Sequence, residues 1–220
     1  MRHYRILDVI ILLACCIPLF ASQGLSLWSG YCETSTNLQC SSFSLEWQDR
    51  GFQVGYRLFY PQNSLALGYT GKIGRNFIYQ AKAHTTIYGQ EGLTSGLEAT
   101  IGLHSHKEHW ELGFLAGAQG EMANLASTSS PLTNLVFAFH GWVRAFLGRA
   151  SVALLYDSST LFWYSYESLV PFVTLEGNYM VLDHFGLGVQ LRMRYADLAP
   201  NEKFHITMVE GLVGGLWKIK

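Results

Sequence analysis

Apolar residues alternate with polar residues or glycine along most of the chain beyond residue 22, and this period of two strongly restricts the fold. In 185–195, Phe, Leu, Val, Leu, Met and Tyr occupy every second position and are separated by Gly, Gln and Arg. The segment 51–60 repeats the pattern with Phe52, Val54, Tyr56 and Leu58. Successive side chains of a β-strand point to opposite faces, so each segment has one apolar face and one polar or glycine face. The pattern therefore predicts an all-β protein.

The same alternation recurs often enough to predict about twelve antiparallel strands, with eight or ten as alternatives. Two weaker segments are 25–31 and 64–71. The ten clearer segments are 41–48, 51–60, 75–88, 93–103, 109–119, 134–147, 149–157, 169–181, 184–195 and 204–218. Counted over twelve strands, the tight turns 49–50, 73–74, 104–108, 148 and 182–183 fall on one side, and the longer loops 32–40, 120–133, 158–168 and 196–203 fall on the other. Short turns on one side and longer loops on the other are typical of transmembrane β-barrels.

Residues 1–22 have the pattern of a cleaved secretory signal peptide. A basic head with Arg2 and Arg5 precedes the apolar run 9–21, which is too short to span a membrane. An alternative is the lipobox-like stretch Leu12-Leu13-Ala14-Cys15, although apolar residues follow it where a polar tether is expected. Signal cleavage leaves residues 23–220 as a single barrel domain.

Cleavage also leaves two cysteines, Cys32 and Cys40, in the exported chain. The polar segment between them is predicted to be a loop, and two cysteines in an exported protein can form a disulfide. We predict a disulfide between them, with two free thiols as the alternative.

We predict that the apolar face of these strands contacts lipid. Only 14% of the residues are charged, against about 25% in soluble domains. Glycines such as Gly96, Gly102 and Gly186 occupy the polar face, and aromatic residues cluster near the ends of the segments, where interfacial girdles lie. The formal net charge of −1 gives no basic excess for a nucleic-acid partner. A secreted β-sandwich or lipocalin-like barrel is the alternative built from the same strands.

On these features the chain resembles small outer-membrane β-barrel proteins of two-membrane bacteria, broadly the OmpW-like and twelve-stranded small-porin groups. In the last strand, Gly214, Trp217 and Ile219 lie much as in the C-terminal assembly signal of such barrels. The departures are Lys220, where an aromatic residue is expected, and Glu210, which interrupts the alternation. The resemblance implies export to the outer membrane, contact with its lipid, and recognition by its assembly machinery.

If the polar faces line the lumen, acidic and basic residues face each other there in nearly equal number. Such charges are expected to pair in a narrow interior. This predicts either a salt-bridged structural barrel or a small passive pore for small solutes, in which the arginines favour anions and the glutamates oppose them. The predicted lumen residues are Glu46, Arg57, Lys82, Glu98, Glu111, Arg144, Glu176, Arg192 and Arg194.

Other functions have weaker signals. No local motif joins a nucleophile to His84, His140 or His205, so we expect no enzymatic activity and no cofactor. The turn 104–109 carries three histidines, which is a weak pattern for a metal site. The aromatic loop 158–168 offers a surface for a host molecule, so an adhesin acting through its outer loops is the alternative function.

Overall fold

The computed structural model describes residues 24–34, 39–59, 62–87, 92–126, 130–157, 172–196 and 205–218. The predicted signal peptide lies outside these residues. Twelve strands account for nearly all of the described chain. They are β1 (Gly24–Thr34), β2 (Gln39–Asp49), β3 (Phe52–Phe59), β4 (Gln62–Ile73), β5 (Phe77–Ile87), β6 (Gly92–His106), β7 (Trp110–Leu125), β8 (Leu132–Leu147), β9 (Ala150–Asp157), β10 (Phe172–Met180), β11 (Phe185–Ala196) and β12 (His205–Trp217).

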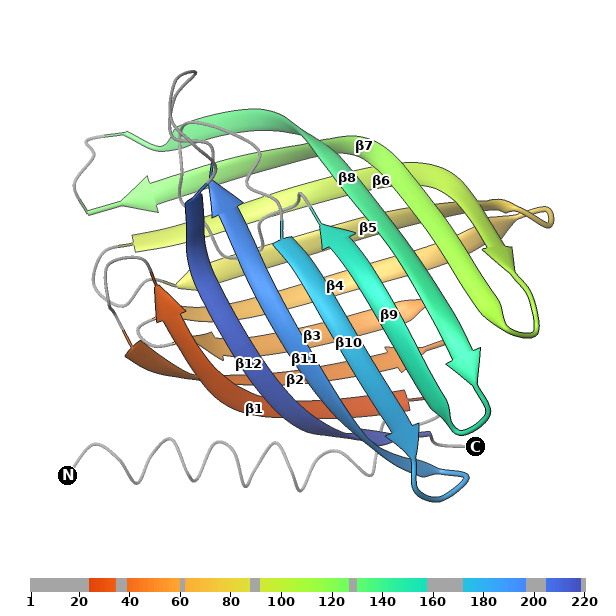
Figure 1. Ribbon diagram of the computed structural model, residues 1–220. Coiled ribbons are helices and arrows are strands. Elements are labelled where there is room, and N and C mark those ends of the chain that lie inside the picture. Colours follow the sequence, from red (N-terminus) through yellow and green to blue (C-terminus); the bar gives the residue numbers. More distant parts are fainter. Residues whose placement is uncertain are drawn as a thin grey trace.

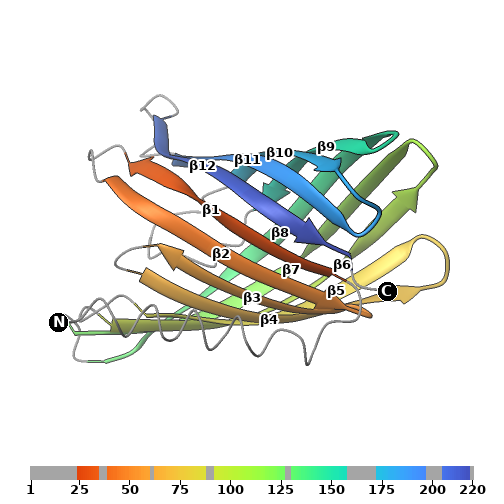
Figure 2. The same cartoon turned by 90° about the horizontal axis from the view of Figure 1, so that it is seen from below.

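The strands form a closed up-and-down barrel (Figures 1 and 2). Each strand pairs antiparallel with the next one in sequence, and β1 pairs with β12 from Leu25↔Trp217 to Thr34↔Met208. Each described strand therefore has a hydrogen-bonded neighbour on both sides. The prediction of about twelve antiparallel strands is confirmed, including the two weaker segments at β1 and β4.

The two ends of the barrel differ in their connections. One end, called the turn side here, holds the connections 50–51, 74–76, 107–109, 148–149 and 181–184. Gly51 and Gly148 have φ angles of 93° and 65°, which glycine adopts without strain in such tight turns. The other end, called the loop side, holds the remaining connections, of which the longest is 158–171. The predicted alternation of tight turns and longer loops is thus confirmed.

Three predicted connections are shorter than expected because strands continue through them. The predicted loop 32–40 narrows to 35–38, so Cys32 and Cys40 lie in β1 and β2. The predicted loop 120–133 narrows to 126–131, and β6 continues through 104–106. At 104–106 and 120–125 polar side chains had suggested a loop, but on alternate positions they face the inside of the barrel. These predicted boundaries were wrong.

The barrel is apolar outside and polar inside. Leu97, Leu135 and Phe137 are at least 70% exposed on the outer face. Gln119, Glu98 and Glu210 are at most 5% exposed and point inward. A soluble barrel or sandwich has the opposite distribution, so that alternative is wrong, and the surface is that of a transmembrane barrel.

Glycines on the inner face make room for large side chains. A Cβ at Gly214 would lie 2.5 Å from Cε3 of Trp28, and one at Gly188 would lie 2.6 Å from Cη2 of the same ring. The indole of Trp28, 1% exposed, therefore packs over β12 and β11 inside the barrel. Trp142 lies in the same way over Gly113. The predicted crowding of the glycine face is confirmed at these positions.

Outward-facing aromatic rings gather at the turn side. Phe52 and Tyr69 have ring centroids 4.8 Å apart, and Tyr79 continues this row at 6.1 Å from Tyr69. Phe185 and Trp217 form a second pair at 5.3 Å. Such a girdle suits a membrane–water interface. Separately, no helix among the described residues is long and apolar enough to cross a membrane.

Candidate functional site

The inner wall carries a buried ion-pair cluster beside the place where β1 meets β12. Glu210 of β12 is 0% exposed, and its carboxylate accepts hydrogen bonds from Ser42 of β2 and Arg57 of β3. Arg192 of β11 places its Nη1 3.7 Å from Glu210 Oε2 and its Nη2 3.8 Å from Glu46 Oε1. We call Ser42, Arg57, Arg192 and Glu210 the seam cluster, because its contacts connect the last strands to the first ones across β1.

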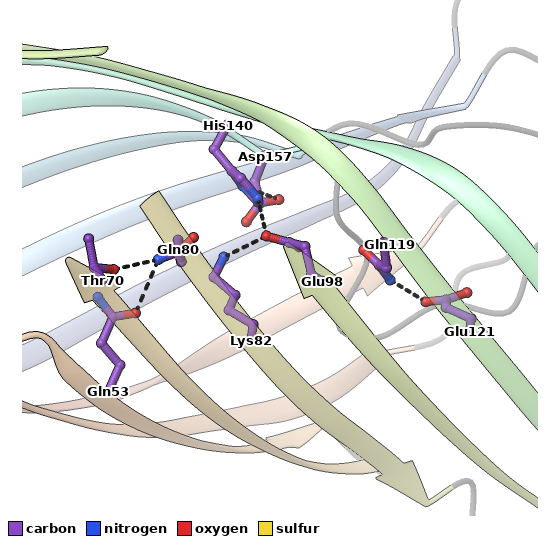
Figure 3. Close-up of polar contacts among 9 residues, drawn as sticks. All are labelled: Gln53, Thr70, Gln80, Lys82, Glu98, Gln119, Glu121, His140 and Asp157. Atoms are coloured by element: carbon purple, nitrogen blue, oxygen red, sulfur yellow. Dashed lines mark hydrogen bonds and ion pairs between the residues drawn. The ribbon is translucent and has the colours of Figure 1, made fainter. Parts of the chain in front are cut away.

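A second cluster lies on the wall formed by β5, β6, β8 and β9 (Figure 3). Glu98 of β6 contacts Lys82 Nζ at 3.8 Å and His140 Nε2 at 2.6 Å. The other ring nitrogen of His140 is 3.0 Å from Asp157 Oδ1. Buried charges are stable only when they are paired, so this chain of contacts lets four ionisable groups share one region of the wall.

Further polar contacts connect other side chains on the inner wall of the barrel. Arg144 of β8 reaches Glu176 of β10 at 3.2 Å, and the other carboxylate oxygen of Glu176 accepts a hydrogen bond from Gln190. His84 Nε2 lies 3.6 Å from Glu121 Oε1. Gln80 donates to Thr70 and, at 3.5 Å, to Gln53 (Figure 3). The lumen is therefore a network of paired groups, with contacts on the inner faces of many strands.

The structure brings the predicted lumen residues together largely as ion pairs. Of the predicted acids and bases, Glu46, Arg57, Lys82, Glu98, Arg144, Glu176 and Arg192 all make ion pairs within the barrel. Glu111 instead pairs with His104, at 3.2 Å. The side chain of Arg194 lies outside the described residues, although its backbone pairs with Phe172 in the ladder.

Cys32 is buried in β1, and the β1–β2 register sets it directly opposite Cys40. The side chain of Cys40 is outside the described residues, so the disulfide stays a prediction. The loop 158–168, on which the adhesin alternative depends, is outside them as well.

Sequence reasoning missed three lumen carboxylates: Glu121, Asp157 and Glu210. Glu210 was expected to interrupt the alternation, and that interpretation was wrong. It keeps the period of two, because its neighbours on the same face are Met208 and Leu212, which are also buried inside. Because these two inward-facing neighbours are apolar, the sequence pattern did not indicate that Glu210 lies on the inner face. Glu121 and Asp157 were assigned to a loop and to a strand end, where no face was assigned.

The contacts of His140 bear on whether it could act as a catalytic base. Both ring nitrogens of His140 contact carboxylates, so this imidazole has no nitrogen left to activate a hydroxyl group. Within the described ranges, no group of three or more His, Cys, Asp or Glu side chains is placed to hold a metal ion. His104 and His106 instead contact Glu111.

Charged side chains are accessible from one end of the lumen to the other. Glu111 and Arg144 lie near the turn side, Lys82 and Arg192 lie along the middle of their strands, and Glu121 and Asp157 lie toward the loop side. Their side-chain exposures run from 14% for Arg192 to 37% for Asp157. The inner wall thus carries partly exposed charged groups along its length.

Comparisons with solved structures agree with this architecture. The structure of the NanC porin superposes with a TM-score of 0.61 at 9% sequence identity, covering 89% of this chain and all of that one. The chain has the fold of an outer-membrane porin. A bacterial polysaccharide outer membrane secretin gives a TM-score of 0.54 at 8% identity and covers 90% of this chain and 99% of its own. No protein-family model and no curated protein matches the sequence. The likeness is one of fold, and the OmpW-like grouping stays a prediction.

Proposed function

We propose that this protein is a passive pore of the bacterial outer membrane for small hydrophilic solutes. The observation that supports a pore over a purely structural barrel is the run of accessible charged groups along the lumen, from Arg144 to Asp157. A polar interior of this kind is typical of water-filled barrels. The porin fold of the chain is consistent with the proposal.

The charge balance of the lumen points away from anion selectivity. Among the described residues, seven carboxylates contact a basic side chain or a histidine inside the lumen: Glu46, Glu98, Glu111, Glu121, Asp157, Glu176 and Glu210. Among the same described residues, the ion-paired Arg and Lys side chains of the lumen number four: Arg57, Lys82, Arg144 and Arg192. Histidines face the remaining acids. The four guanidinium and ammonium groups are each neutralised locally, so the pore slightly favours cations.

The test is single-channel recording of the full chain, purified from an outer membrane and inserted into a planar bilayer. We expect discrete conductance steps and a reversal potential, under a KCl gradient, of the sign that shows K⁺ passing more readily than Cl⁻. A protein that inserts in folded form yet gives no steps would contradict the pore. Steps with Cl⁻ preferred would contradict the charge assignment.

A further inference from the structure

Four rings form a continuous patch inside the barrel at the turn side. His104 and His106 come from β6, and Trp142 and Phe146 come from β8, so the rings face each other across β7. The ring centroids of Trp142 and His104 are 6.1 Å apart, those of His104 and His106 are 6.4 Å apart, and those of His106 and Phe146 are 5.6 Å apart. Gly113 of β7 makes the patch possible, because any side chain there would collide with the indole of Trp142.

A single carboxylate lies among these rings. Glu111 Oε1 accepts hydrogen bonds from Trp142 Nε1 at 2.9 Å and from His104 Nε2 at 3.2 Å. These two bonds fix the orientation of the carboxylate. Its second oxygen, Oε2, accepts no hydrogen bond from the described residues and lies 4.0 Å from His106 Nδ1. We call His104, His106, Glu111, Trp142 and Phe146 the mouth cluster.

The electrostatic surroundings of the cluster are acidic. Arg144 stands opposite Glu111 in the ladder and is close enough to attract its charge, while its guanidinium also contacts Glu176 across β9. Glu111 and Glu176 together outnumber Arg144 by one negative charge. In the adjoining turn, the positive charge of Lys107 and the negative charge of Glu108 add up to zero. The side chain of His106 is 59% exposed, which marks the side from which a solute reaches the cluster.

We propose that the mouth cluster binds small organic cations of the alkylammonium class as they enter or leave the lumen. The inference deepens the proposed pore function and rests on it for its physiological meaning. Aromatic faces attract ammonium groups through the ring quadrupole, and a carboxylate with one open oxygen supplies the counter-charge. An anion is repelled by Glu111. A sugar needs several hydrogen-bond donors and acceptors, whereas Glu111 offers one unoccupied acceptor here.

The probe is choline, compared with its uncharged isostere 3,3-dimethylbutan-1-ol and with glucose. Binding is measured by titration calorimetry on the full chain in detergent, where no conductance is required. We expect saturable binding of choline, with the neutral isostere at least about tenfold weaker. Equal affinity for choline and its isostere, or tighter binding of glucose, would overturn the assignment.

The variants are Trp142→Phe and Glu111→Gln, each checked for a heat-modifiable folded band on an unboiled gel. Each should weaken choline binding about three- to tenfold. Trp110→Phe is the matched control, since Trp110 precedes Glu111 but faces outward and is 42% exposed. Equal losses for Trp110→Phe and Trp142→Phe would place the binding elsewhere and overturn the proposal. Choline binding without conductance would refute only the pore, and conductance without choline binding would refute only the mouth cluster.

Discussion

The seam cluster and the mouth cluster lie on the inner wall of one barrel, but water reaches them very differently. In the seam cluster, the carboxylate of Glu210 is fully buried beneath Arg57, Arg192 and Ser42. In the mouth cluster, Glu111 is 19% exposed and keeps one oxygen open. Both contain a carboxylate that the protein holds by specific contacts. The first carboxylate is fully buried, and the second is partly exposed.

This difference reconciles two expectations that the sequence leaves open, a salt-bridged structural barrel and a small channel. The pairs near the seam connect β12 to β2 and β3 and stabilise closure of the barrel. The charged groups on the remaining wall are partly exposed within the lumen. If the protein is the pore we propose, structural and transport roles are divided between regions of the same lumen.

Removing the buried carboxylate should have the largest effect. Glu210→Ala leaves Arg57 and Arg192 buried beside each other without their shared counter-charge. Breaking a buried pair in this way costs about 3–5 kcal/mol of unfolding free energy. Urea unfolding in lipid vesicles measures it. Glu46→Ala is the control, because Glu46 also pairs with Arg192 but is 52% exposed, and its loss should cost less than about 1 kcal/mol. Similar losses for both variants would contradict the distinction.

Side chains on the outer face of the barrel lie in a third environment, the lipid. Leu97 of β6 is 70% exposed and faces lipid, whereas its neighbour Glu98 faces the lumen. Leu97→Arg should reduce the free energy of unfolding by about 2–4 kcal/mol, since arginine is costly near the bilayer midplane. The same vesicle unfolding assay measures the change. A neutral result would mean that the apolar outer face does not contact lipid.

Packing around Trp28 can be tested with a single methyl group. In Gly214→Ala the new Cβ would meet Trp28 Cε3 at 2.5 Å and the carbonyl oxygen of Leu27 at 2.4 Å. Overpacking of this kind costs about 1–3 kcal/mol. Gly211→Ala in the same strand has no atom within 4 Å of its Cβ and should be neutral. Equal stability of the two variants by urea unfolding would show that Trp28 does not occupy the space over β12.

The smallest expected effect concerns an accessible base. Arg144→Gln removes a lumen charge that is 31% exposed, so it should raise the preference for K⁺ over Cl⁻ while leaving stability within about 1 kcal/mol. The change in permeability ratio should stay below about tenfold, because charges 4 Å apart in water interact by about 1 kcal/mol. Reversal potentials measure it. Arg149→Gln, in the turn and 62% exposed, serves as the control that should leave selectivity nearly unchanged.

The fold could be predicted from the sequence because the period of two survives wherever lipid and lumen lie on opposite sides of a strand. β11 shows this most clearly, with Leu187, Val189 and Leu191 outside and Gln190 and Arg192 inside. Strand ends were harder to predict. Polar residues such as those at 104–106 and 120–125 occur equally in loops and on lumen faces, so composition alone does not distinguish the two.

The sequence predicted that ion pairs form inside the lumen, but it did not predict which residues form them. Charge balance predicted that acids and bases meet, yet it did not identify partners, because Arg57 and Glu210 are 153 residues apart in the sequence. Glu210 was missed because buried Met208 and Leu212 surround it on the inner face. The mouth cluster depends on strand neighbours across β7, which only the register reveals.

Thiol labelling of adjacent residues tests most directly whether the barrel wall has one face toward a water-accessible lumen and the other toward lipid. In a chain whose four cysteines are replaced by serine, Arg144→Cys and Val143→Cys lie next to each other on β8 but on opposite faces. Arg192→Cys and Leu191→Cys repeat the comparison on β11. With the protein in vesicles, a membrane-impermeant maleimide should label positions 144 and 192 and leave 143 and 191 unmodified. Labelling of 143 and 191, or of none of the four, would contradict a water-accessible lumen enclosed by a lipid-facing wall.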